Sequence, residues 1–181
     1  MPDVSRAQAP MGLSEIAEEF RQLDGVRRVQ GLSLGEAERY NSLFARLSDL
    51  LASGERHRRV DARQFLRVRF EMQLVVRTAA GERLASCCDF GGGGCAIACA
   101  ERFELGDDLW LDGARLLGAR HPLHGRAVVV WHQLPAGAEA ESGYGLRFAI
   151  DSPQMRDQID RLLYRVLDLF LHPPGARALA G

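Results

Sequence analysis

Lysine is absent from this 181-residue chain, so all 23 of its basic residues are arginine. The absence excludes several kinds of chemistry. A P-loop needs a lysine on the phosphates of its nucleotide, a protein kinase needs a strand lysine, and Schiff-base catalysis needs a lysine amine. The tripeptide Asp89-Phe90-Gly91 is therefore not the metal-binding motif of a kinase.

Long apolar runs and a strong net charge are also lacking. No apolar stretch reaches the roughly 18 residues of a membrane-spanning helix. The first residues, Met1 to Val4, show no basic segment followed by an apolar one, as a signal peptide would. We therefore predict a cytoplasmic protein with reduced thiols and no membrane insertion. The net charge of −1 argues against binding a nucleic acid polymer, because such proteins carry a broad basic field.

Spacings typical of metal sites and of catalysis are missing as well. Cys95 and Cys99 would lie about 13 Å apart on a strand, and the neighbours Cys87 and Cys88 would point to opposite faces of a sheet. Structural zinc instead prefers two cysteines close together on a turn. No Ser–His–Asp or Cys–His pairing stands out, and local spacing suggests no Glu/Asp pair. We predict no metal, no cofactor and no enzymatic activity, and interpret the cysteines as small buried hydrophobic residues.

Two helices are predicted in the first third of the chain. Apolar residues at helical spacing indicate a helix over residues 14–23, which Asp24-Gly25 is expected to end. A second helix should run from about 34 to 52, because Ser33 and Glu36 form a capping box at its start. Its apolar stripe consists of Tyr40, Leu43, Phe44, Leu47, Leu50 and Leu51. The stripe either packs within the protein as ordinary core or forms a self-association surface that would give a homodimer.

The pattern of the remaining chain predicts mainly short strands. Residues 66–77 alternate in part between apolar and polar side chains, and turn signals recur at short intervals up to a last strand over 144–150. This pattern predicts a small antiparallel barrel or sandwich. Ser152-Pro153 then predicts the start of a helix over 153–171.

The predicted organisation has five parts. They are a disordered N-terminus at 1–12, a helical extension at 13–53, an arginine-rich linker at 54–69 that leads into the first strand, a barrel with its C-terminal helix at 66–172, and a tail at 173–181.

Two segments concentrate the polar chemistry. Six arginines lie between Arg56 and Arg69, and the stretch from Cys88 to Ile97 holds one carboxylate and four consecutive glycines. The planar fork of arginine pairs two donors with phosphate oxygens, and its flat face stacks on a base. Together the segments predict a pocket for an anionic ligand. The alternatives are a solvated linker for the arginines and a plain loop or bulge for the glycines.

The order and spacing of these motifs resemble the PilZ family. Arg63-x-x-x-Arg67 followed by Val68 matches the family's RxxxR motif, and Asp89-x-Gly91-x-x-Gly94 matches [D/N]xSxxG except at Gly91, where the family usually has serine. The segment 145–148 matches the family's GxxF strand, and the resemblance covers roughly residues 59 to 170. It implies a mainly β fold, a small antiparallel PilZ-like β-barrel with a C-terminal α-helix, here with an N-terminal two-helix extension.

The resemblance also implies a function. The family binds the bacterial second messenger cyclic di-GMP, so the chain would be a non-catalytic receptor that relays binding to a partner protein, in motility or surface behaviour. Arg63 and Arg67 would hold phosphate and guanine, Asp89 would accept a hydrogen bond from a guanine N–H, and Gly94 would permit a backbone turn that a Cβ would block. The predicted ligand-binding residues are Arg59, Arg63, Arg67, Asp89, Gly91 and Gly94.

Gly91 supports an alternative, a degenerate PilZ-like adaptor that binds proteins but no nucleotide. Loss of the serine hydroxyl would cost about 1.5–3 kcal/mol of binding free energy. Ordering four free glycines would cost about 1 kcal/mol or more for each. On these magnitudes we expect the affinity for cyclic di-GMP to be weakened rather than abolished.

Overall fold

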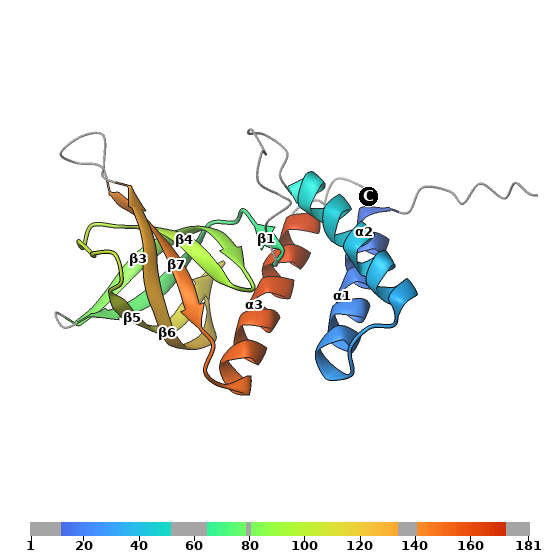
Figure 1. Ribbon diagram of the computed structural model, residues 1–181. Coiled ribbons are helices and arrows are strands. Elements are labelled where there is room, and N and C mark those ends of the chain that lie inside the picture. The colour runs from blue at the N-terminus through green and yellow to red at the C-terminus, as the bar shows by residue number, and fades with distance from the viewer. Residues whose placement is uncertain (1–11, 52–64, 79–80, 134–140, 173–181) are drawn as a thin grey trace, which may run out of the picture. The chain divides into compact units, whose positions relative to one another are not determined.

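The structure, a computed structural model, describes residues 12–51, 65–78, 81–133 and 141–172. These residues fall into two units, one within residues 1–61 and one within residues 62–181. The first unit is helical, and the second contains all seven strands and the last helix (Figure 1). Arg59 and Arg63, with most of the predicted linker and both predicted tails, lie outside the described residues.

The first unit is a hairpin of two helices, α1 over Leu13–Val29 and α2 over Leu34–Leu51. The predicted capping box of α2 is confirmed, because Ser33 N donates to Glu36 Oε2 over 2.9 Å and Glu36 N donates to Ser33 Oγ over 3.4 Å. The predicted end of the first helix at Asp24-Gly25 is wrong. Asp24 is only 2% exposed and receives Arg27 and Arg28 on its carboxylate, so it lies inside the helix rather than capping it.

Aromatic rings join the two helices. Phe20 of α1 stacks on Tyr40 of α2 with ring centroids 5.0 Å apart. The ring centroid of Phe44 lies 6.3 Å from that of Phe20. At the rim, Arg39 donates to Glu19 over 2.6 Å. This part of the apolar stripe on α2 therefore packs against α1 as core. The homodimer that the stripe also suggested stays a prediction.

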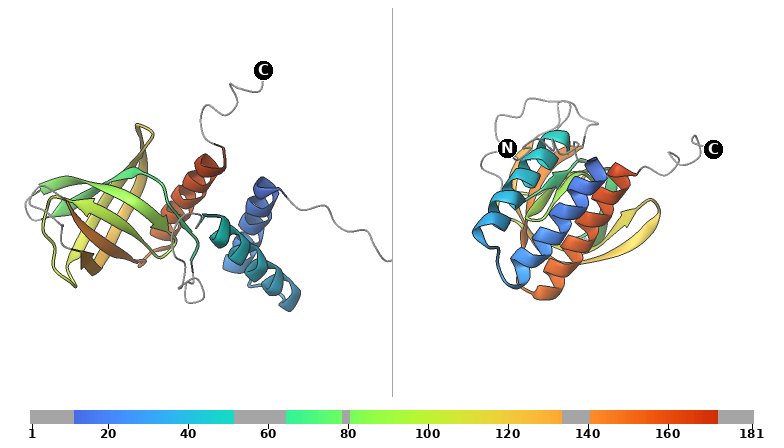
Figure 2. Two further views of the ribbon diagram at one scale, coloured as in Figure 1. Left: turned by 90° about the horizontal axis from the view of Figure 1, so that it is seen from above. Right: turned by 90° about the vertical axis from the view of Figure 1, so that its right-hand side faces the viewer.

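The second unit is a closed antiparallel barrel. Its strands are β1 Arg67–Val68, β2 Met72–Thr78, β3 Gly81–Gly91, β4 Gly94–Cys99, β5 Asp108–Leu116, β6 Ala119–Gln133 and β7 Ser142–Ala149. The order is β1-β3-β2-β5-β6-β7-β4, and β4 pairs back with β3, so β2 to β7 close a six-stranded ring (Figure 2). The predicted antiparallel barrel with a C-terminal helix and two N-terminal helices is confirmed.

Two details of the strand prediction are wrong. The single strand expected over 66–77 is divided, because β1 pairs with β3 at Phe90 and Gly91 whereas β2 pairs with β3 at Gly81 to Cys87. The turn signal that Asp112-Gly113 would normally provide does not end β5. Instead the β5–β6 pairing shifts register there, and Gly113 adopts a φ of 136° that lets the strand continue to Leu116.

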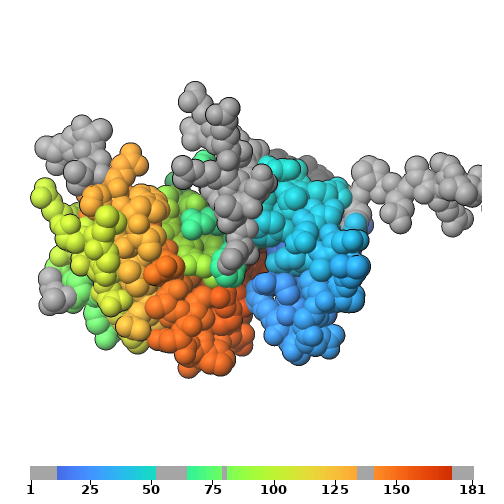
Figure 3. Space-filling view, viewed as in Figure 1, coloured from blue at the N-terminus to red at the C-terminus, as the bar shows by residue number. Residues whose placement is uncertain are grey.

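Helix α3, Pro153–Leu171, packs against the barrel. Ser152 Oγ accepts a hydrogen bond from Met155 N over 3.2 Å, and Pro153 occupies the first turn, as the sequence predicted. A Cβ at Gly125 in β6 would overlap the Met155 side chain, so that glycine lets the helix approach the strand. In the space-filling view the atoms of α3 are contiguous with those of the strands (Figure 3). Within the described residues, no helix is long and apolar enough to cross a membrane.

Candidate functional site

Arg67 and Asp89 meet on the outer face of the barrel. Arg67 in β1 lies opposite Gly91 in β3, and its Nη1 donates to Asp89 Oδ2 over 3.2 Å. The two side chains are 35% and 26% exposed, so the ion pair borders solvent. The structure thus brings together four of the predicted ligand-binding residues, Arg67, Asp89, Gly91 and Gly94. Arg59 and Arg63 remain predictions because they lie outside the described residues.

The second carboxylate oxygen of Asp89 is unpaired. Oδ1 is buried and has no hydrogen-bond partner among the described residues. The β3–β4 pairing shifts register between Cys87 and Asp89, and this bulge sets Asp89 opposite Ala96 on the outer face. A buried acceptor without a partner costs about 1–3 kcal/mol of stability. Asp89 therefore keeps one acceptor oxygen, which an external N–H donor reaches only after the atoms that cover it move aside.

Gly91 and Gly94 are required by close approach of neighbouring backbone. A Cβ at Gly91 would lie 2.7 Å from Arg67 Cγ and 2.7 Å from the Leu66 carbonyl oxygen. A Cβ at Gly94 would overlap the Leu146 carbonyl oxygen of β7. The reason predicted for Gly94 was wrong in part, because a neighbouring strand and not a turn excludes the side chain there. Glycine at position 91 accompanies the tight packing of β1 on β3.

The turn between β3 and β4 is held from two sides. The ring of Phe65 covers it, since a Cβ at Gly93 would lie 2.7 Å from that ring. From α3, Arg156 Nη1 donates to Gly92 O over 2.9 Å. From β7, Phe148 N donates to Gly93 O over 3.0 Å. The expectation that four free glycines must be ordered on binding is therefore wrong.

Phe65 and Arg156 also contact each other, and sequence reasoning missed both. The guanidinium carbon of Arg156 lies 5.4 Å from the centroid of the Phe65 ring. Phe65 stands between the two arginines of the RxxxR motif, and an aromatic residue in a polar segment was a usable signal. Nothing local distinguishes Arg156 from the other arginines of α3. The site is thus connected to the C-terminal helix through one ring and one guanidinium.

Trp131 forms the opposite edge of the same outer face. The strand register aligns Asp89 with Ala96, Ala96 with Gly145, and Gly145 with Trp131. The indole lies over Gly145, where a Cβ would overlap it, and the side chain is 44% exposed. A register shift between Val129 and Trp131 turns the tryptophan outward. Small residues therefore separate an aromatic edge from the Arg67–Asp89 pair.

The cysteines beneath the site are free thiols. Cys87 and Cys95 are buried inside the barrel, whereas Cys88 is exposed, contrary to the prediction that all four are buried. A hydrogen bond with Cys87, followed by burial, raises the pKa of Cys95 well above its usual value, and burial raises the pKa of Cys88. Thiols with raised pKa values stay protonated and are poor nucleophiles and metal ligands. Among the described residues no cluster of His, Cys, Asp or Glu is placed to hold a metal ion.

The chain is similar to several solved structures. Among solved structures, the inhibitor of motility MotI/DgrA from Bacillus subtilis is 18% identical, with a TM-score of 0.47 over 57% of this chain and 50% of that chain. The K. pneumonia MrkH–c-di-GMP complex is 21% identical, with a TM-score of 0.47 over 62% and 54%. The PilZ domain of YcgR from Escherichia coli with c-di-GMP is 13% identical, with a TM-score of 0.42 over 59% and 92%.

The match thus spans about half the length of the first two proteins and nearly all of the isolated domain. No curated protein matches the chain. The family model described as "PilZ domain" matches residues 61–165, which is more than half of the chain and covers the barrel together with most of α3. The chain therefore belongs to the PilZ domain family.

Proposed function

We propose that this protein is a non-catalytic receptor for cyclic di-GMP. The ligand lies on the outer face of the barrel, between the Arg67–Asp89 pair and Trp131. The observation that carries the proposal is the unpaired Oδ1 of Asp89, beside a partly exposed arginine. Membership of the PilZ domain family supports the same ligand.

The chemistry of the face fits the two parts of the ligand. Asp89 Oδ1 accepts a hydrogen bond from a guanine N–H, which relieves the cost of a buried acceptor without a partner. The guanidinium of Arg67 has donors beyond the one that contacts Asp89 and directs them to phosphate or guanine. Arg59 and Arg63, earlier in the same segment, supply further donors to the phosphates.

Trp131 supplies a stacking surface for one guanine. The indole itself covers Gly145, but Ala96 on the next strand carries only a methyl group, so a flat base can approach the strands beside the indole. Stacking of a base on an aromatic side chain contributes about 1–3 kcal/mol. This contribution is similar in size to the loss from the missing serine hydroxyl, about 1.5–3 kcal/mol. Because Arg156 and Phe148 already hold the glycine turn, ordering it costs little on binding.

The signal passes from the arginine segment to α3. Phe65 lies between Arg63 and Arg67 in sequence and contacts Arg156 of α3. When the arginines close on the ligand, Phe65 moves with them, and the contact with Arg156 changes. A cytoplasmic partner protein then binds differently to the changed surface, and this partner acts in motility or surface behaviour. Homodimerisation through the N-terminal helices is a further part of the proposal.

A second candidate function rests on Gly91. The packing of β1 leaves no room for the serine of the family at this position unless Arg67 or Leu66 shifts. An adaptor that binds proteins and no nucleotide would tolerate such packing. In that case Arg67 and Asp89 would act only as a structural ion pair between β1 and β3.

Calorimetry with cyclic di-GMP separates the two functions. The receptor gives a saturable heat that Arg67→Ala and Asp89→Ala each reduce by about tenfold or more in affinity. Arg126→Ala is the matched control, because Arg126 is an exposed arginine on β6 whose carboxylate contacts are both 3.9 Å long. No heat from the wild-type protein at high ligand concentration refutes the receptor and favours the adaptor.

A further inference from the structure

A second group of arginines lies on the barrel wall formed by β3, β2, β5 and β6. Arg83 of β3, Arg115 of β5 and Arg120 of β6 line a depression of about 220 Å³. Val75, Glu82 and Leu84 complete its lining. Arg67 and Asp89 take no part in it. The depression is therefore a separate feature of the barrel.

Arg115 and Arg120 have no carboxylate partner among the described residues, whereas Arg83 donates to Glu101 Oε2 over 3.1 Å. Arg115 lies directly opposite Arg120 in the β5–β6 register, and like charges in that position destabilise a sheet. Arg120 donates to a backbone carbonyl, that of Asp112, over 3.1 Å, and Arg115 has no partner among the described residues. Glu82 lines the depression but lies 3.6 Å from Arg77. Two facing arginines without a carboxylate between them suit an anionic ligand.

A larger depression adjoins the first and shares Arg115. Its volume is about 610 Å³, within the range of small-molecule sites. The floor is a row of outer residues across neighbouring strands, in which Arg115 pairs with Gln73, Gln73 with Ser86, and Ser86 with Ala98. The full lining is Glu71, Met72, Gln73, Ser86, Cys87, Cys88, Ala98, Arg115, Leu117 and Gly118.

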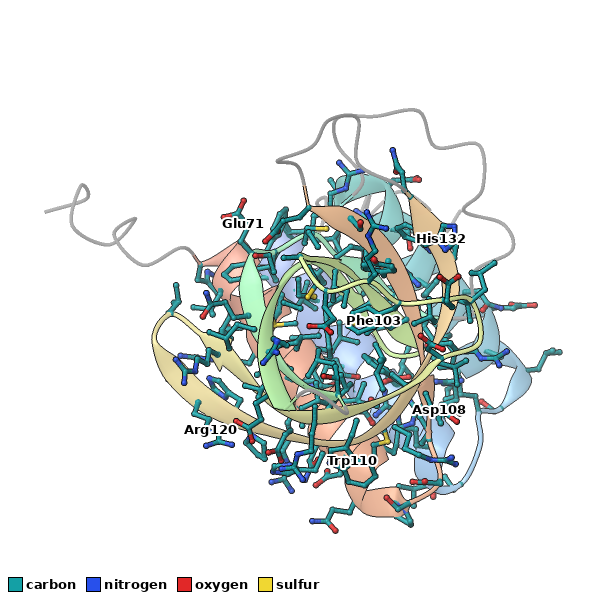
Figure 4. All side chains as sticks on the ribbon, turned by 90° about the vertical axis from the view of Figure 1, so that its left-hand side faces the viewer. Glu71, Phe103, Asp108, Trp110, Arg120 and His132 are labelled. Atoms are coloured by element: carbon teal, nitrogen blue, oxygen red, sulfur yellow. The ribbon has the colours of Figure 1, made fainter. Side chains whose placement is uncertain are left out.

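The rim of the larger depression carries one carboxylate and one apolar side chain. Glu71 is exposed and immediately precedes β2. Leu117 is 62% exposed and adopts a φ of 49°, which L residues rarely do, in the turn between β5 and β6. Glu71 and Arg120 lie on the same side of the barrel, Arg120 on the projecting β5–β6 hairpin (Figure 4). The carboxylate of Glu71 and the side chain of Leu117 thus border the larger depression, which reaches the arginines through Arg115.

We propose that the two depressions form a second site, which binds a nucleoside phosphate. The phosphates contact Arg115 and Arg120, with Arg83 at the edge, and the base enters the larger depression beneath Leu117. The carboxylate of Glu71 accepts hydrogen bonds from the base. Guanine presents two adjacent N–H donors on one edge and adenine presents a single amino group, so the site prefers guanosine phosphates. This site does not depend on cyclic di-GMP binding at Arg67.

The test is a two-dimensional NMR titration of the full chain with GDP, ADP and pyrophosphate. We expect GDP to shift the amides of Gln73, Ser86 and Gly118 while Gly91 and Gly145 stay unchanged. Arg115→Ala and Arg120→Ala should each lower the affinity for GDP by about tenfold or more, as loss of a charged hydrogen bond requires. Glu71→Gln reduces the preference for GDP over ADP.

Two control variants make the result specific. Arg126→Ala removes an exposed arginine of β6 that lies outside both linings, and Arg67→Ala removes the other site. Both should bind GDP as the wild-type protein does. GDP shifts confined to Gly91 and Gly145, or unaltered GDP binding by Arg115→Ala, would overturn the second site. Equal affinities for pyrophosphate and GDP would overturn the base-binding part and leave only a general anion surface.

Discussion

Replacing Gly91 by serine restores the residue that the PilZ motif usually carries, and the structure predicts that it harms this protein. The new Cβ would lie 2.7 Å from both Arg67 Cγ and the Leu66 carbonyl oxygen. A contact to a flexible side chain can relax, but a contact to backbone must move β1. Overpacking of this kind costs about 1–3 kcal/mol. We therefore expect Gly91→Ser to lower the free energy of unfolding by that amount.

The same substitution should not tighten cyclic di-GMP binding. Moving β1 displaces Arg67 from Asp89, and the loss of that arrangement offsets the added hydroxyl. Urea unfolding followed by circular dichroism gives the stability, and calorimetry gives the affinity. The matched control is Gly143→Ser on β7, where the nearest atoms to a Cβ are an ordinary 3.8 Å away.

One result would refute this reasoning about Gly91. If Gly91→Ser is as stable as Gly143→Ser and binds cyclic di-GMP about tenfold more tightly than the wild-type protein, β1 does not pack on β3 as described. The missing hydroxyl would then be the sole reason for weakened affinity.

Three further predictions concern the edges of the site and the helical hairpin. Trp131→Ala should reduce the binding free energy of cyclic di-GMP by about 1–3 kcal/mol in calorimetry. Trp110→Ala, which removes an exposed tryptophan of β5, should not, and equal losses would contradict the stacking role. Arg156→Ala removes the hydrogen bond to the glycine turn and the contact with Phe65, so the free energy of unfolding should fall by about 1–2 kcal/mol in urea. Arg161→Ala, an exposed arginine of the same helix, should cost less than half of that. Burial raises the pKa of Tyr40 to about 12 from its ordinary value of 10.0, so its stabilising contribution is full below pH 10 and is lost as the pH rises through about 12. Ultraviolet titration should show this late tyrosinate step in the wild-type protein and not in Tyr40→Phe.

Local signals predicted those parts of the fold whose cause is local. Ser33 with Glu36, and Ser152 with Pro153, fix the starts of two helices through bonds within one turn. The dipeptide Asp24-Gly25 is also a local signal, one that is typical of a helix end, yet α1 continues through it to Val29. There the carboxylate is satisfied by Arg27 and Arg28, and burial of the hairpin outweighs the preference of the dipeptide.

The site was predicted only where a motif carried it. Arg67 and Asp89 were expected together from the resemblance, and the pairing of β1 with β3 brings them into contact. Three site residues come from distant parts of the chain: Phe65 before β1, Trp131 in β6 and Arg156 in α3. Only tertiary packing makes them neighbours of the glycine turn and of Gly145. No periodicity or spacing in the sequence encodes such contacts.

Because β3 and β6 each contain a register shift, the number of residues before the shift decides which side chains point out of the barrel. Asp89 and Trp131 each follow a bulge that changes which side of the strand faces outward. In a regular strand, a shift of one residue moves every later side chain to the opposite face. A related chain with the same motif letters but one residue fewer before Asp89 would direct the carboxylate into the barrel. For this site the length of each strand segment is therefore as much a determinant of binding as the identity of its side chains.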